Sequence, residues 1–120
     1  MREIVEKYYK RWHKIPEDEE LPEALIKNID PITERAEDEL KKIMWFPSVR
    51  DAAQKALADE GNSILYRLVK PPKELEGYGI GLVPYGCDFE LLMNFAGFEL
   101  ISWDGEYSLM EYAEREGLIK

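Results

Sequence analysis

The sequence predicts an α+β fold: about four N-terminal helices, a small antiparallel sheet of three to four strands, and a short C-terminal helix. Two patterns support this prediction. Apolar residues recur with helical spacing from residue 2 to about residue 57, whereas they alternate with polar residues or glycine from residue 77 to residue 103. Because 120 residues can bury one core, we expect a single domain over residues 1–120.

The first helix is expected over residues 2–13, where Lys and Arg lie opposite an aromatic seam. It should end before Pro16, because the residue preceding a proline is disfavoured in the α conformation. We expect the aromatic face to pack in the core. A helix that binds a partner or a membrane surface is the alternative.

Three further helices are expected at about residues 22–29, 31–46 and 49–60. Asp30 can cap the second of these, with a proline at the first helical position. Ser48, followed three residues later by an aspartate, is a near capping box for the last. The first half of the chain is therefore predicted to be helical.

The strands are expected in the alternating half of the chain, at residues 63–70, 77–82, 87–95 and 98–103. A two-residue hairpin at Ala96-Gly97 would join the last two. Beyond the sheet, the Ser-x-x-Glu pattern beginning at Ser108 predicts a final helix over about 109–116.

The register of these strands leaves one sheet face with little side-chain cover, because alternate residues of the 77–82 strand are glycines. We predict a shallow trough on that face, with an apolar wall and an acidic rim, as a protein-binding surface. Its residues are Gly79, Gly81, Asp88, Glu90, Leu92, Glu99, Ile101 and Trp103. Burial of the glycines under Trp103 or the last helix is the alternative, and a homodimer could also use an uncovered face.

The acidic residues that give the chain its net charge of −9 are unevenly distributed along the sequence. An acidic patch is expected at Glu17, Asp18, Glu19, Glu20, Glu23, Glu34, Glu37 and Asp38. Such a surface repels nucleic acids and anionic membranes and favours a partner protein with a basic surface. The alternative is that the charge serves solubility alone.

No motif in the sequence identifies a reaction. His13 is the single histidine, and we expect Cys87 to be a buried, inert thiol. Neither stands at metal-ligand spacing, and the Gly-x-Gly-x-Gly run from Gly77 lies in a strand pattern rather than before a helix. We therefore predict no catalytic residue, no metal and no cofactor, and we do not expect an enzyme.

Composition indicates the cellular setting. One cysteine excludes an internal disulfide, and no apolar run approaches the roughly 20 residues of a membrane helix. With no apolar segment typical of a signal peptide at the N-terminus, we expect a cytoplasmic protein. Many Glu and Lys residues with only four Asn and Gln are typical of thermophilic proteins.

Together these features favour a small acidic protein-interaction module, of the kind that inhibits a target or confers immunity by masking a basic, nucleic-acid-binding surface. The alternative is a small-molecule-binding domain with a pocket between sheet and helices, lined by Tyr8, Tyr66 or Tyr78. A carboxylate enzyme is the least favoured class, because the predicted acidic residues lie on solvent faces.

Overall fold

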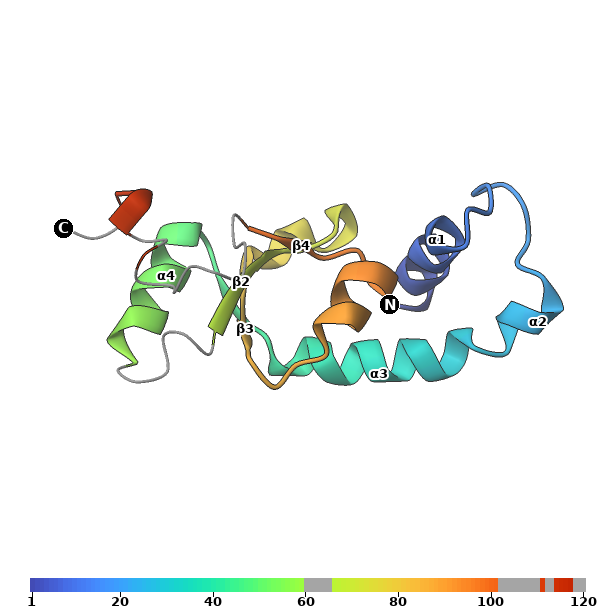
Figure 1. Cartoon of the computed structure of the whole chain (residues 1–120), viewed down its shortest axis with the longest axis horizontal. Helices are drawn as coiled ribbons and strands as arrows, with labels where there is room; N and C mark the ends of the chain where they lie inside the picture. Colours follow the sequence, from blue (N-terminus) through green and yellow to red (C-terminus); the bar gives the residue numbers. More distant parts are fainter. Residues whose placement is uncertain (60–65, 102–110, 112–113, 118–120) are drawn as a thin grey trace. The chain divides into compact units, whose positions relative to one another are not determined.

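The structure, a computed structural model, describes residues 1–59, 66–101, 111 and 114–117 (Figure 1). These residues form a mixed helix and sheet structure, so the predicted α+β class is confirmed. The chain divides into two compact units. Unit 1 comprises Met1–Lys41 and Asp88–Phe98, and unit 2 comprises Lys42–Cys87 and Glu99–Lys120. The expected single domain stays a prediction.

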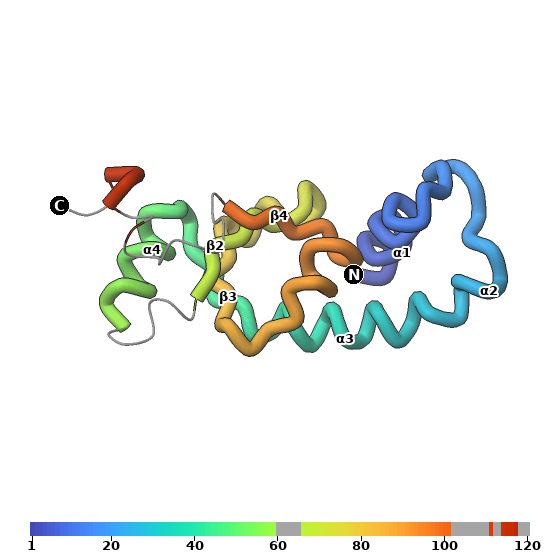
Figure 2. Tube along the Cα trace, viewed as in Figure 1, coloured from blue at the N-terminus to red at the C-terminus, as the bar shows by residue number. Residues whose placement is uncertain are grey.

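Unit 1 contains the first three helices and a helical segment from later in the chain. α1 (Arg2–Trp12) confirms the first predicted helix, α2 (Glu23–Ile26) is shorter than expected, and α3 (Ile29–Lys42) begins before Asp30. α1 packs against η3 (Leu91–Phe95), and Figure 2 shows the two side by side. The buried cluster at this end of the unit consists of Tyr9, Leu21 and Ile29, surrounded by Ile15, Leu25, Ile32 and Phe95.

α1 ends in a Schellman turn that places Lys14 in the left-handed conformation, with φ of 60°. The Lys14 N–H donates to the Arg11 carbonyl at 3.1 Å, and the Ile15 N–H donates to the Lys10 carbonyl at 2.8 Å. Ile15 then packs on the cluster around Tyr9, the hydrophobic contact that usually accompanies this turn. A glycine is the common residue at the position that Lys14 occupies, because it avoids the strain of a positive φ.

The prediction of a strand over residues 87–95 and a hairpin at Ala96-Gly97 is wrong. Residues 89 and 90 are α-helical and η3 continues them as a π-helical turn. Leu91 and Leu92 are both buried, which a helix with a broad apolar face permits and an alternating strand does not. Gly97 has φ of 75°, and a Cβ there would lie 2.3 Å from the Tyr8 ring, so this glycine lets α1 approach the segment closely.

Unit 2 is built on an antiparallel sheet with strand order β1-β3-β2-β4. Its strands are β1 (Met44–Phe46), β2 (Tyr66–Lys70), β3 (Ile80–Pro84) and β4 (Glu99–Leu100). The predicted extension of the third helix to Phe46 is therefore wrong: α3 ends at Lys42, and the next residues pair with β3 instead. The predicted strand over 63–70 is confirmed for its described part, residues 66–70.

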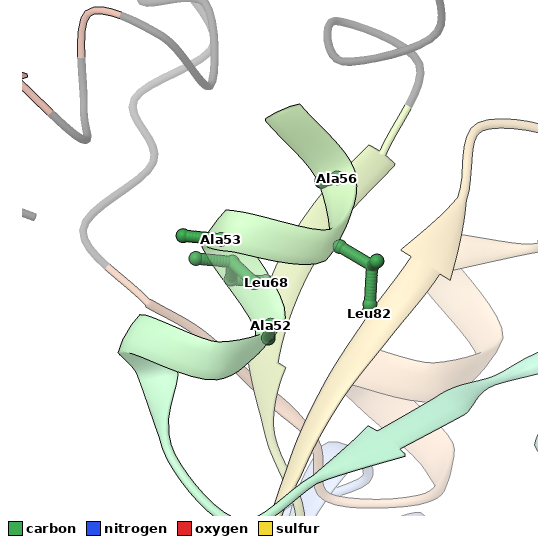
Figure 3. Close-up of a cluster of buried hydrophobic side chains, with 5 residues drawn as sticks. All are labelled: Ala52, Ala53, Ala56, Leu68 and Leu82. Carbon is green, nitrogen blue, oxygen red and sulfur yellow. The ribbon is translucent and has the colours of Figure 1, made fainter. Parts of the chain in front are cut away.

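One face of this sheet is covered by α4 (Val49–Ala58). Ala52, Ala53 and Ala56 of α4 pack on Leu68 of β2 and Leu82 of β3, which lie opposite each other in register (Figure 3). All five are fully buried, and the small alanine side chains let the helix approach the strands closely. The predicted cap is confirmed, since Ser48 Oγ accepts the Asp51 N–H at 3.2 Å.

The glycine-rich stretch before β3 is not a strand throughout. Residues Lys73–Tyr78 form η2, a 3₁₀ helix, and β3 begins only after Gly79. Of the predicted C-terminal helix, Glu111, Glu114 and Arg115 are helical, while Ser108 lies outside the described residues.

Substitution of Gly79 can test the boundary between η2 and β3. Its φ of 93° with ψ of −143° is close to a region open essentially to glycine alone, and an added Cβ would lie 2.1 Å from the Phe46 carbonyl oxygen. We expect Gly79→Ala to lower the free energy of unfolding by about 2–4 kcal/mol in urea denaturation. Gly77→Ala is the control: beyond its own chain neighbours and the local helix backbone, no described atom lies within 4 Å of its added Cβ, so it should change stability by less than about 0.5 kcal/mol. Equal effects of the two variants would contradict this account.

Candidate functional site

The predicted trough does not form as a sheet surface, because its residues lie on different kinds of element. Asp88, Glu90 and Leu92 belong to the helical segment of unit 1, and Leu92 is fully buried. The other described members, Gly79, Gly81, Glu99 and Ile101, belong to unit 2, while Trp103 lies outside the described residues. The register that was to align these residues is therefore wrong, and a binding role for any of them stays a prediction.

Within unit 2, Gly81 does not floor an open surface. It is buried, and an added Cβ would lie 2.8 Å from a Val69 methyl and 2.9 Å from an Ile43 methyl, with the Trp45 ring at 3.5 Å. These side chains lie against the glycine, while Trp103, which the alternative named for that role, lies outside the described residues. Glu99 is exposed and lies opposite Lys70 in the pairing of β4 with β2.

Asp88 is a structural residue in unit 1 rather than part of a sheet rim. Its Oδ1 accepts the Leu91 N–H at 3.1 Å, which makes it the N-cap of the 89–95 helix. Its own N–H donates to Glu39 Oε2 at 3.1 Å, and its Oδ2 accepts a hydrogen bond from Arg35. Arg35 and Glu39 lie one turn apart on α3, so one aspartate joins the helix start to α3.

The eight residues predicted to form an acidic patch are exposed carboxylates of unit 1, and their role as a binding surface stays a prediction. Four lie in the loop after α1, one in α2 and three along α3: Glu17, Asp18, Glu19, Glu20, Glu23, Glu34, Glu37 and Asp38. Among the described residues, none of these eight makes an ion pair. Three cations of unit 1 pair with carboxylates outside this set: Arg2 with Asp30, Lys10 with Glu6, and Arg35 with Asp88.

His13, Cys87 and Tyr66 carry potentially reactive side chains, and each makes contacts that suit a structural role. The His13 ring lies edge-on to Tyr9 with ring centroids 4.5 Å apart, and Cys87 is buried. The Tyr66 hydroxyl donates to Asp59 Oδ2 at 2.7 Å, and this hydrogen bond, with burial and the charge of Asp59, raises the pKa of Tyr66. A raised pKa keeps the Tyr66 hydroxyl protonated, so it can donate the hydrogen bond that links β2 to Asp59 at the end of α4. No group of three or more metal-ligating side chains occurs among the described residues.

Sequence reasoning missed two adjoining hollows on the basic flank of α1. The larger, about 560 Å³, is lined by Arg11, Lys14, Ile15, Pro16 and Glu17. The smaller, about 310 Å³, is lined by Lys7, Lys10 and Glu17. The cluster of Lys and Arg on this helix was visible in the sequence. The Schellman turn beside it was not, because Lys14 takes the left-handed position at which a glycine would have signalled the turn.

The role assigned to Asp88 can be tested by substitution. We expect Asp88→Ala to lower the free energy of unfolding by about 1–2 kcal/mol, mainly because it removes the helix cap. The same substitution removes the ion pair with Arg35, but that pair is exposed and contributes little to stability. Asp88→Asn, which keeps a capping oxygen, should cost less. Glu90→Ala on the same helix is the control and should stay within about 0.5 kcal/mol of the parent in chemical denaturation. A loss from Glu90→Ala as large as that from Asp88→Ala would contradict the capping role.

Comparison with protein-family models, with curated proteins and with solved structures finds no match to this chain. Within the part of the chain that the structure describes, no helix has the length and apolar character needed to cross a membrane.

Proposed function

We propose that this protein is a small acidic interaction module that binds a basic surface of another protein. The target surface would be one that binds nucleic acid, and the module would act as an inhibitor or an immunity-type protein by masking it. The observation that supports this proposal is the set of eight exposed carboxylates in unit 1 that make no ion pair among the described residues.

These carboxylates are poorly explained as contributors to the stability of the fold. Glu34 and Asp38 are four residues apart on α3, and Glu34 and Glu37 are three apart, so like charges face each other on the helix surface. Each such pair destabilises a helix by about 0.2–0.5 kcal/mol. Acidic side chains that repel each other in the free protein would gain favourable partners on a basic surface, and the same field would accelerate the encounter.

The negative charge of this region also favours a basic partner protein over nucleic acid or an anionic membrane. Residues 17–41 hold ten acidic and three basic side chains, so this part of the chain repels a polyanion. A cytoplasmic setting belongs to the proposal, since a lone buried cysteine suits a reducing compartment.

The test begins with affinity capture from the native host, followed by measurement of the dissociation constant for the captured partner. We expect Glu34→Gln/Glu37→Gln/Asp38→Asn to weaken binding about tenfold and to reduce its dependence on salt, because three interfacial charges are lost. Fluorescence anisotropy at two or more ionic strengths would measure both effects.

The matched control is Glu3→Gln/Glu76→Gln/Glu114→Gln, which also removes three exposed carboxylates but none from the acidic patch. It should leave the affinity within about twofold of the parent. A captured partner whose affinity ignores both the patch variant and salt would contradict the proposal, as would equal losses from patch and control.

A further inference from the structure

We propose that the two adjoining hollows on α1 form a binding site for a small phosphorylated anion with at least two anionic groups. Four cationic side chains line them: Lys7 and Lys10 the smaller, Arg11 and Lys14 the larger. Glu17 lines both and is the one acidic residue among the lining residues. The site shares Glu17 with the acidic patch but is otherwise lined by cationic and apolar residues, and its binding does not depend on a protein partner.

The Lys10 side chain is mostly buried and forms part of the wall of the smaller hollow. The side chain is only 12% exposed. Its Nζ donates to the Glu17 carbonyl oxygen at 3.2 Å, and the Glu6 carboxylate stands 4.0 Å away, beyond hydrogen-bond distance. An ammonium has three donors, so within the described residues Lys10 keeps donor capacity at the wall of the smaller hollow. An anionic oxygen there could accept a charge-assisted hydrogen bond from this ammonium.

Lys14 provides a second, independent observation. Positive charge near the end of α1 suits the helix dipole, which accounts for Lys10 and Arg11 in the last turn. The dipole does not account for a lysine in the left-handed position, where glycine would cost less strain. At this position the side chain adds a second cation, beside Arg11, to the lining of the larger hollow.

The chemistry of the lining residues selects the ligand. Arg11 supplies a planar guanidinium suited to two oxygens of one phosphate, and the lysines supply compact charges. The ligand should be small, because the neighbouring residues Glu17, Asp18, Glu19 and Glu20 would repel an extended polyanion such as nucleic acid. Two hollows that meet at Glu17 favour two anionic groups over one.

The test uses isothermal titration calorimetry of the full chain with pyrophosphate, in a phosphate-free buffer at low salt. We expect saturable binding of one pyrophosphate per chain, weaker binding of inorganic phosphate, and no displacement by a single-stranded oligonucleotide. Lys10→Met keeps the apolar stem and removes the ammonium. It should weaken pyrophosphate binding about tenfold, as expected for one charged hydrogen bond.

A second variant, Arg11→Gln/Lys14→Gln, should also weaken binding at least tenfold. Its matched control is Lys27→Gln/Lys41→Gln, which removes two exposed cations of the same unit that do not line the hollows. Thermal melts would establish that each variant folds. Absence of saturable binding, equal losses from the control and the site variants, or tighter binding of the oligonucleotide than of pyrophosphate would each overturn the proposal.

Discussion

The architecture of unit 1 depends on the hydrogen bonds of Asp88. This unit is assembled from two separate stretches of chain, Met1–Lys41 and Asp88–Phe98. Asp88 stands at the start of the second stretch, where it caps the 89–95 helix and contacts Arg35 and Glu39 of α3. A cap fixes where a helix begins, and here the backbone N–H of the capping residue also joins that start to Glu39 of α3. The apolar residues that follow can then pack against α1.

The acidic and the basic side chains of unit 1 lie in different surroundings. The acidic patch is exposed and its members repel one another, so it adds little to stability and is open to a partner. The cations of α1 are gathered at hollows, and one of them is largely buried. The two proposals are therefore compatible in a protein with a net charge of −9: the acidic surface would bind a large basic partner, and the small site would bind a compact anion.

The sequence was informative where local signals determine the structure. α1, the Ser48 cap of α4 and the strand ending at Lys70 follow from periodicity and capping residues, and each is confirmed. Two signals were read wrongly. Met44–Phe46 continues an apolar helical stripe, yet pairing with β3 makes it a strand, and such pairing is invisible to a local pattern. Residues 87–95 alternate, but Asp88 at their start and Gly97 at their end are equally the cap and stop of a helix. The error moved three predicted site residues into a different unit.

Exposure of the eight acidic side chains could be predicted because it needs only local information, whereas the trough needed correct register across several strands. The most direct test of the proposed interaction is zero-length carbodiimide crosslinking of the complex with its captured partner, which joins carboxylates to lysines in contact. We expect links from partner lysines to Glu17–Glu20 and to Glu34, Glu37 or Asp38. Links confined to carboxylates outside this patch, such as Glu99 or Glu114, would contradict it.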